Sequence, residues 1–151
     1  MPQSLAQIYL HIVFSTKNRD PFLQNQTVRR DMHAYLAGIC RNQGAPAVII
    51  GGVADHVHLL CRFSRTLTVS DFLQQLKGDS SHWAKTRDPA LAAFAWQNGY
   101  GAFSVSPGHL PALRQYIGNQ EEHHKKVSFQ DELRRILRKY GVEYDDRYLW
   151  D

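Results

Sequence analysis

The sequence predicts an α+β fold, a ferredoxin-like split βαβ sandwich with a four-stranded antiparallel sheet and additional helices at the C-terminal end. Segments rich in β-branched and aromatic residues alternate with segments whose apolar residues recur at helical spacing. Their order is strand, helix, strand, strand, helix, strand, followed by two helices. No internal repeat, low-complexity tract or linker divides the chain, so residues 1–151 are expected to form a single domain.

The first four elements follow from local patterns. Residues 8–14 are rich in β-branched and aromatic side chains and predict a strand. Apolar residues at helical spacing predict a helix over 25–42, which the Gln-Gly-Ala-Pro segment at 43–46 ends. Residues 47–53 and 56–63 predict two strands joined by a tight turn.

The chain after residue 63 predicts one strand and three helices. Ser70 is a candidate N-cap for the first of these helices. Residues 94–105 predict a fourth strand, although two glycines interrupt it. Helices are predicted over 110–125 and 129–140, and Gly141 ends the second. In a ferredoxin-like sandwich the helices cover one face of the sheet, so we expect the other face to be free for a site.

The composition excludes several classes of protein. The chain has 151 residues, 43% of them hydrophobic, and two cysteines, which excludes an acidic disordered chain, a collagen-like repeat and a disulfide scaffold. It lacks an apolar run of the roughly 18 residues that a membrane span needs, and its N-terminus does not resemble a signal peptide. We therefore expect no membrane partner and a location in the reducing cytoplasm.

Positive charge gathers in the first part of the chain. Residues 1–87 hold ten Lys and Arg against five Asp and Glu, whereas residues 88–151 hold eight against nine. A basic segment of this kind indicates a polyanionic partner such as nucleic acid. The eight histidines are a second unusual feature, and they direct attention to what they ligate or protonate.

The first chemical motif is His56-Val57-His58, within the strand predicted over 56–63. Residues i and i+2 of a strand point to the same face, so the two imidazoles lie side by side while Val57 points toward the core. Such a pair is half of a divalent-metal site, and two half-exposed histidines at a sheet edge are the alternative. Asp55, directly before the pair, is either an orienting group for a histidine or a turn residue.

The second motif lies in the helix predicted over 110–125. Tyr116 and Gln120 are one helical turn apart there, with Glu121 and His124 nearby. A phenol beside a neutral oxygen ligand suits nucleophilic attack on a phosphate that a metal polarises. A surface tyrosine and glutamine on an amphipathic helix are the alternative.

Taken together, these motifs resemble a known family, the single-tyrosine HUH transposases of small insertion sequences, the two-hundred/six-hundred-and-five class, which move as single-stranded DNA. The resemblance covers nearly the whole chain, and the ordered set of segments is much more specific than any one of them. The matching segments are His11, Thr16-Lys17-Asn18-Arg19, Asp55-His56-Val57-His58, Leu76-Lys77-Gly78-Asp79-Ser80-Ser81, Trp96-Gln97-Asn98-Gly99-Tyr100-Gly101 and Tyr116-Ile117-Gly118-Asn119-Gln120.

The resemblance implies a reaction. Family members bind transposon-end hairpins as single-stranded DNA, then cleave and rejoin single-stranded DNA through a 5′-phosphotyrosine intermediate, without a nucleotide cofactor. Mapped onto this chain, Tyr116 is the nucleophile, and the ligands of a Mg²⁺ or Mn²⁺ ion are His56, His58 and Gln120. Two imidazoles and an amide are not the hard oxygen set that Mg²⁺ prefers, which favours Mn²⁺.

The resemblance also implies a partner and a location. The family works as a homodimer with shared active sites, in which the tyrosine helix of one chain reaches the histidine pair of the other. Such an enzyme acts on DNA in the bacterial or archaeal cytoplasm, at the nucleoid.

Several further residues have two interpretations. Gly118 either lets the tyrosine helix move between two placements or packs closely against a neighbour. Four basic residues are candidate phosphate contacts, with solvated surface charge as the alternative: Lys17, Arg19, Lys77 and Lys85. Four aromatic residues are candidates for stacking on unpaired bases, with core packing as the alternative: Trp83, Trp96, Tyr100 and Phe103.

Other classes of protein fit less well. A two-histidine phosphoesterase needs two separate His-x-Thr/Ser motifs, a histidine-triad hydrolase needs a histidine where Leu60 stands, and a Cys/His zinc site needs paired cysteines. A relaxase or replication initiator shares the HUH chemistry in a longer chain. The main alternative is a catalytically silent or domesticated single-stranded nucleic-acid-binding protein on the same fold.

Overall fold

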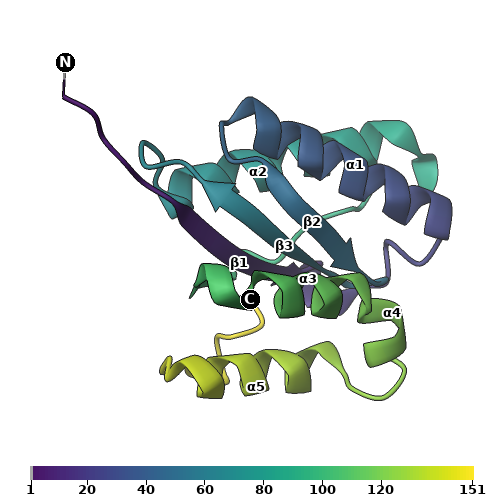
Figure 1. Cartoon of the computed structure of the whole chain (residues 1–151). Helices are drawn as coiled ribbons and strands as arrows, with labels where there is room; N and C mark the ends of the chain where they lie inside the picture. Colours follow the sequence, from purple (N-terminus) through teal and green to yellow (C-terminus); the bar gives the residue numbers. More distant parts are fainter. Residues whose placement is uncertain (1) are drawn as a thin grey trace.

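A four-stranded antiparallel sheet forms the centre of the molecule (Figure 1). The structure is a computed structural model that describes residues 2–151. The strands are β1 (Ile8–Ser15), β2 (Ala47–Gly52), β3 (His56–Phe63) and β4 (Gly101–Val105), in the order β2-β3-β1-β4. Every neighbouring pair is antiparallel. This order is that of the ferredoxin-like sandwich, so the predicted fold class is confirmed.

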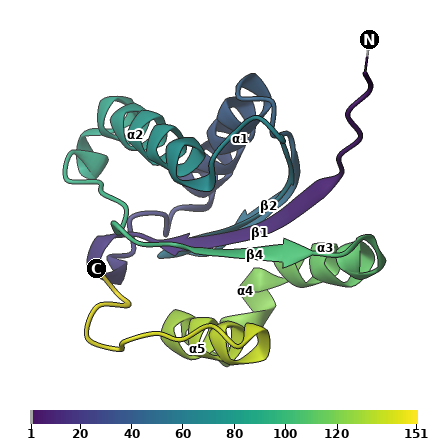
Figure 2. The ribbon, with the colours of Figure 1, turned by 90° about the vertical axis from the view of Figure 1, so that its left-hand side faces the viewer.

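Helices lie on both faces of the sheet (Figure 2). The two long helices, α1 (Gln26–Asn42) and α2 (Val69–Arg87), cover one face. Three shorter helices follow β4 and lie on the other side: α3 (Leu110–Gly118), α4 (Gln120–His123) and α5 (Phe129–Tyr140). Among residues 2–151, no helix is both long and apolar enough to cross a membrane.

The alternation of side chains along the strands separates two hydrophobic clusters. Ile12 and Phe14 of β1 join Val57 and Leu59 of β3 in the main core beneath α1 and α2. Val13, between Ile12 and Phe14, points the other way, into a smaller cluster with side chains of β4 and α5: Phe103, Phe129, Leu133 and Leu137. The sheet is therefore buried on both faces, and the interpretation that Val57 points toward the core is confirmed.

Short polar residues fix the ends of the helices. The Asn25 side chain accepts hydrogen bonds from the amides of Thr27 and Val28 at the start of α1. α2 is capped by Thr68 and not by Ser70, because Thr68 Oγ1 accepts from the amide of Asp71. The prediction of the cap was thus two residues late.

The C-terminal helices correct two expectations. The face of the sheet opposite α1 and α2 is not free, because α5 buries an apolar stripe of Phe129, Leu133 and Leu137 against it. The single helix predicted over 110–125 is two helices, which meet at Asn119 (φ −104°, ψ 22°).

The fourth strand is shorter than predicted. Residues 101–105 pair with β1, but the preceding segment follows the core and makes only an isolated bridge between Thr16 and Trp96. Phe94 and Trp96 pack edge to face with ring centroids 4.8 Å apart, and both belong to the main core. Their burial holds this segment in place, together with backbone hydrogen bonds from Lys17 to Ala95 and from Gln97 to Ser15.

Gly51 sets how closely α3 approaches the sheet. A Cβ atom at this position would lie 2.3 Å from the carbonyl oxygen of Ile117 in α3. Only a residue without a side chain allows this contact between β2 and the helix. By contrast, a Cβ at Gly38 in α1 would meet no atom within 4 Å.

We predict that Gly51→Ala destabilises the fold by about 1–3 kcal/mol, because the added methyl group forces α3 away from β2. Gly38→Ala is the matched control, and it is expected to stabilise by about 0.5–1 kcal/mol because alanine favours the helix interior. Urea unfolding of both variants checks the pair. Equal stability of the Gly51 and Gly38 variants would contradict the close packing of α3.

Candidate active site

The histidine pair lies on the sheet face that α5 covers. His56 and His58 are fully buried, and their ring centroids are 5.2 Å apart. His58 stands opposite Val13 in the β1–β3 register, and Val13 belongs to the cluster under α5. The prediction that the two imidazoles share a face is confirmed, but the pair is buried and not half-exposed at an edge.

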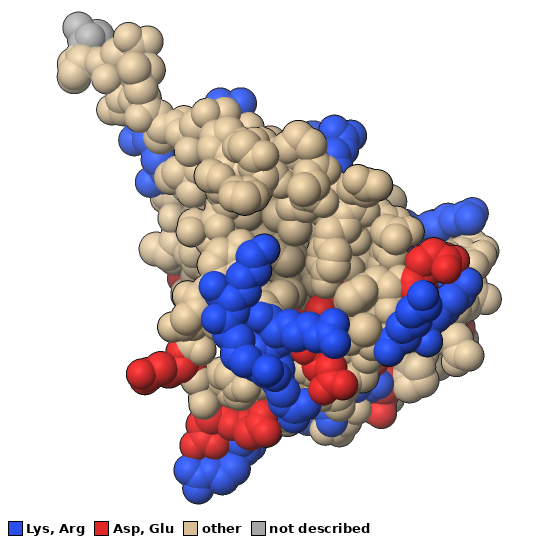
Figure 3. All heavy atoms as spheres, turned by 60° about the horizontal axis from the view of Figure 1, so that its bottom comes forward, with Lys and Arg blue, Asp and Glu red and all other residues tan. Residues whose placement is uncertain are grey.

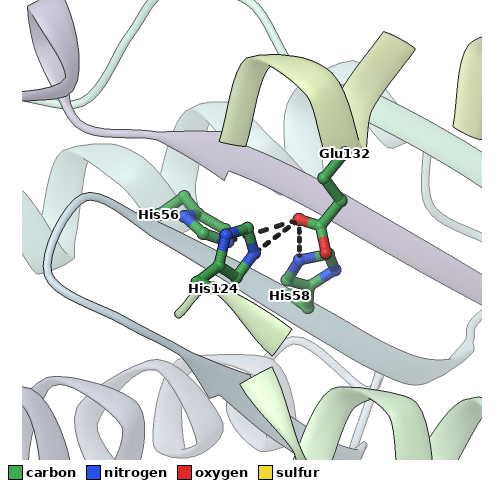
Figure 4. A group of neighbouring side chains, drawn as sticks. All are labelled: His56, His58, His124 and Glu132. Atoms are coloured by element: carbon green, nitrogen blue, oxygen red, sulfur yellow. Dashed lines mark hydrogen bonds and ion pairs between the residues drawn. The ribbon is translucent and has the colours of Figure 1, made fainter. Parts of the chain in front are cut away.

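Glu132 of α5 is the centre of the site (Figure 4). Its side chain is 2% exposed. Its Oε1 atom lies 2.8 Å from Nε2 of His58, 3.1 Å from Nε2 of His124 and 3.4 Å from Nε2 of His56. The sequence motifs do not identify this residue. A signal was present, because Glu132 interrupts the apolar stripe of its helix, one position before Leu133.

Each of these three histidines also contacts a group on its other ring nitrogen. Nδ1 of His56 lies 2.7 Å from Oδ1 of Asp55. Nδ1 of His58 lies 2.8 Å from Nε2 of His11. Nδ1 of His124 donates to the carbonyl of Val127 at 2.6 Å. Of the two readings of Asp55, this contact supports the orienting group.

Tyr116 and Gln120 reach the same cluster from α3 and α4. The Tyr116 hydroxyl donates to Oε2 of Glu132 and lies 3.4 Å from Nε2 of His123. Gln120 is 1% exposed. Its Oε1 lies 3.2 Å from Nε2 of His56, and its Nε2 donates to Oε2 of Glu132 at 3.2 Å.

The structure brings together some of the predicted residues and separates others. Tyr116, Gln120 and His124 surround the histidine pair. Glu121 points away, because its carboxylate pairs with Arg29 at 3.1 Å and is 59% exposed. Tyr116 contacts the cluster within its own chain, and the tyrosine helix supplied by a partner, which the resemblance implies, stays a prediction.

The cluster changes the protonation of its members. Burial raises the pKa of Glu132, but the surrounding His124, His56 and His58 outweigh burial and hold this pKa well below its usual range. Burial lowers the pKa of His56, but Asp55 and Glu132 outweigh it and raise the pKa to about 9. Burial and the nearby Glu132 carboxylate raise the pKa of Tyr116, so the phenol is protonated at neutral pH.

The donor atoms suit a divalent metal ion. Ligand atoms of His56, His58, His124 and Glu132 all lie within 4.8 Å of one another, and three of these side chains are buried. Imidazole nitrogens with a carboxylate oxygen match the preferences of first-row transition metals more closely than those of Mg²⁺. The residues present therefore fit the metal that the resemblance implies.

A cavity of about 690 Å³ leads to Tyr116 between β4, α3 and α5. Arg135 and Lys139 of α5 line it, together with His109 at the start of α3. Figure 3 shows Lys and Arg side chains gathered on this underside of the molecule, beside Asp and Glu. A polyanion that enters the cavity meets positive charge on the way to the tyrosine hydroxyl.

The four predicted phosphate contacts have different surroundings. Lys17 and Lys85 are exposed, and Arg19 is half-buried with its guanidinium 5.6 Å from the ring centroid of Trp150. Lys77 donates to three backbone carbonyls, at 2.9, 3.2 and 2.6 Å, in residues 97–99. Burial lowers its pKa to about 8. These contacts hold the loop before β4, and the role in DNA binding stays a prediction for all four.

The four aromatic candidates for base stacking also have different surroundings. Trp96 and Phe103 belong to hydrophobic clusters, whereas Tyr100 is 42% exposed. Trp83 stacks on Tyr35 with ring centroids 4.8 Å apart. Trp83 also packs against the main core, so core packing explains three of the four.

Gly118 ends α3, directly before the break at Asn119. A Cβ at this position would meet Cδ1 of Ile49 at 3.6 Å, an ordinary van der Waals distance. Close packing therefore does not require a glycine here, and movement of the helix stays a hypothesis.

Comparison with known proteins gives consistent results. The family model described as "Transposase IS200 like" matches residues 4–120, more than half of the chain. The chain is 23% identical over 121 residues to the ISDra2 transposase TnpA of Deinococcus radiodurans, covering 77% of this chain and 86% of that protein.

Two solved structures are similar. The crystal structure of a putative transposase from Deinococcus radiodurans R1 superposes with a TM-score of 0.62 at 25% identity, covering 80% of this chain and 95% of that one. A REP-associated tyrosine transposase bound to a REP hairpin superposes with a TM-score of 0.53 at 11% identity, covering 78% of this chain and 67% of that one. The second similarity is one of fold.

His33 lines the cavity next to Gln120, and its protonation makes the stability of the fold depend on pH. Burial, with a contribution from Arg29, lowers the pKa of His33 in α1 from 6.5 to about 4. Between these values the unfolded chain binds the proton more readily than the folded one, so stability falls as the pH falls from 6.5 to 4.

We predict that His33→Asn makes the melting temperature fall less steeply between pH 6.5 and 4. His82→Asn, at an exposed position of α2, is the control and is expected to keep the slope of the parent protein. Circular dichroism melts across this range measure both. An unchanged slope in His33→Asn would show that this histidine is protonated equally in both states.

Proposed function

Since this chain belongs to the family of IS200-like transposases, we propose that it cleaves and rejoins single-stranded DNA through a 5′-phosphotyrosine intermediate. Its substrate is single-stranded DNA with hairpins at the transposon ends. The nucleophile is Tyr116. A divalent metal, Mn²⁺ or Mg²⁺, is required, and a nucleotide cofactor is not.

One observation carries this proposal. The hydroxyl of Tyr116 is hydrogen-bonded to Glu132, the carboxylate that also contacts His56 and His58. Residues spread from His56 to Glu132 in the sequence thereby bring a nucleophile, a proton acceptor and metal-ligand atoms to one point. A purely DNA-binding domain does not need this arrangement.

The reaction exchanges one ester bond for another. The tyrosine oxygen attacks the phosphorus atom of a phosphodiester, the bond to the 3′ oxygen breaks, and the leaving 3′ oxygen takes up a proton to become the 3′ hydroxyl. Because the Tyr116 phenol is protonated, it must lose its proton, and His123 is the proposed acceptor, since the pKa of Glu132 is held well below its usual range. Attack of that 3′ hydroxyl, or of another, on the phosphotyrosine reverses the step and rejoins DNA.

His56, His58 and Gln120 are the residues proposed to hold the metal, with Gln120 Oε1 located 3.2 Å from His56 Nε2. When bound, the ion supplies positive charge that stabilises the phenolate and the developing charge on the phosphate. Asp55 orients His56 through the contact with Nδ1.

Basic residues bind the DNA in this proposal. Lys17, Arg19, Lys77 and Lys85 contact phosphates of the hairpin, and Arg135 and Lys139 receive the strand that enters the cavity to Tyr116. The proposed hairpin substrate is supported by the similar fold of a REP-associated tyrosine transposase bound to a REP hairpin.

We also propose that the protein acts as a homodimer, in the cytoplasm and at the nucleoid. The resemblance implies that such a dimer shares its active sites. We propose instead that each chain supplies its own tyrosine, because Tyr116 contacts Glu132 of the same chain.

We predict that the purified protein forms a covalent complex with a labelled single-stranded hairpin in the presence of Mn²⁺, and that Tyr116→Phe and the His56→Ala/His58→Ala double variant lose this complex. The hairpins are taken from imperfect palindromes that flank the gene. Tyr148→Phe, which changes a tyrosine that is 66% exposed, is the matched control and keeps the complex. Denaturing gel electrophoresis detects the protein–DNA band.

A covalent band that persists in Tyr116→Phe would refute the assignment of the nucleophile. Hairpin binding without a covalent band in the parent protein, with every flanking palindrome and both metals, would instead favour a catalytically silent DNA-binding protein.

A further inference from the structure

Three imidazole nitrogens converge on one carboxylate oxygen. Nε2 of His58, His124 and His56 lie 2.8, 3.1 and 3.4 Å from Oε1 of Glu132. Figure 4 shows that the three rings come from two separate elements and point their nitrogens at the same place. His124 and Glu132 are not among the residues that the sequence motifs assign to the metal.

The outer nitrogen of each ring is already engaged. Asp55, His11 and the carbonyl of Val127 lie within 2.6–2.8 Å of the Nδ1 atoms of His56, His58 and His124. Metal-binding histidines usually make such a contact with the nitrogen that does not bind the ion, which fixes the orientation of the ring. The pattern therefore leaves the three Nε2 atoms as the ligand atoms.

His124 shows the consequence most clearly. Its Nδ1 donates to the backbone, so the hydrogen of the neutral ring is on that nitrogen. Its Nε2 is buried and, although it lies 3.1 Å from Glu132 Oε1, it has no hydrogen-bond partner. A buried nitrogen that faces a carboxylate oxygen without a hydrogen bond is matched by a cation that both atoms coordinate.

We infer that His124 and Glu132 are protein ligands of the metal, together with His56 and His58. The inference deepens the proposed function and rests on it for the use of the metal in DNA cleavage. The four ligand atoms lie within 4.8 Å of one another. Gln120, whose Nε2 donates to the other oxygen of Glu132, orients the carboxylate in addition to its own proposed contact.

This donor set selects the class of ion. Three imidazoles and one carboxylate bind first-row transition metals, with Zn²⁺ tighter than Mn²⁺, and they bind Mg²⁺ weakly because Mg²⁺ prefers oxygen ligands. The carboxylate also brings a negative charge that the amide of Gln120 lacks. The site is thus expected to hold Mn²⁺ in the presence of excess Mg²⁺.

The test measures Mn²⁺ binding to the full chain without DNA, by isothermal titration calorimetry. Glu132→Gln and His124→Asn are each expected to weaken Mn²⁺ binding by at least about tenfold. Two matched controls, Glu122→Gln and His82→Asn, change exposed residues and keep the affinity of the parent protein. Wild-type affinity in both Glu132→Gln and His124→Asn would overturn the inference.

Pulsed electron paramagnetic resonance of bound Mn²⁺ gives a second readout that does not depend on Glu132→Gln folding. The nitrogen couplings are expected to indicate three imidazoles in the parent protein and two in His124→Asn. Two imidazoles in both proteins would contradict a role for His124.

The two proposals fail in different ways. Loss of Mn²⁺ binding in the variants, with a parent protein that cleaves no hairpin, would support the metal site and reject the proposed function. Metal-dependent hairpin cleavage by the parent protein, with wild-type Mn²⁺ affinity in both variants, would support the proposed function. The same result would reject His124 and Glu132 as metal ligands.

Discussion

The buried carboxylate of Glu132 is the interaction on which the C-terminal half of the structure depends. An apolar stripe draws α5 onto the sheet, but many rotations of a helix can bury leucines. The buried charge favours the rotation in which Glu132 contacts the histidines of β3, His124 directly after α4, and the tyrosine of α3. Breaking a buried ion pair by removing one partner costs about 3–5 kcal/mol, and Glu132 contacts side chains of β3, of α3 and of the residue that follows α4.

The same interaction determines the character of the site. Because α5 covers the histidine pair, the cluster is shielded from water, and charges there interact more strongly than they would on an open sheet face. The cavity beside Tyr116 stays accessible, and Arg135 and Lys139 line it. A polyanionic strand can therefore reach the hydroxyl, while the donor atoms behind it are held by buried contacts.

Sequence patterns predict the parts of this arrangement that local geometry controls. The period of two in β3 places His56 and His58 on one face, and helical spacing places Tyr116 near Gln120 despite the break at Asn119. Glu132 escaped prediction because its role arises from packing between segments about 75 positions apart. The length of β4 was wrong for a related reason, since Phe94 and Trp96 fit both a strand and the core, and only the tertiary structure chooses between them.

The central claim is that one chain brings the tyrosine and the histidine pair together. Mixing subunits tests it most directly: Tyr116→Phe protein and His56→Ala/His58→Ala protein are unfolded together, refolded, and given a cleavable hairpin. Each chain then lacks one half of the site, and the structure predicts no more covalent complex than either variant forms alone. Recovery of the complex in the mixture would contradict the account, because it requires a tyrosine from one chain to act with the histidines of another.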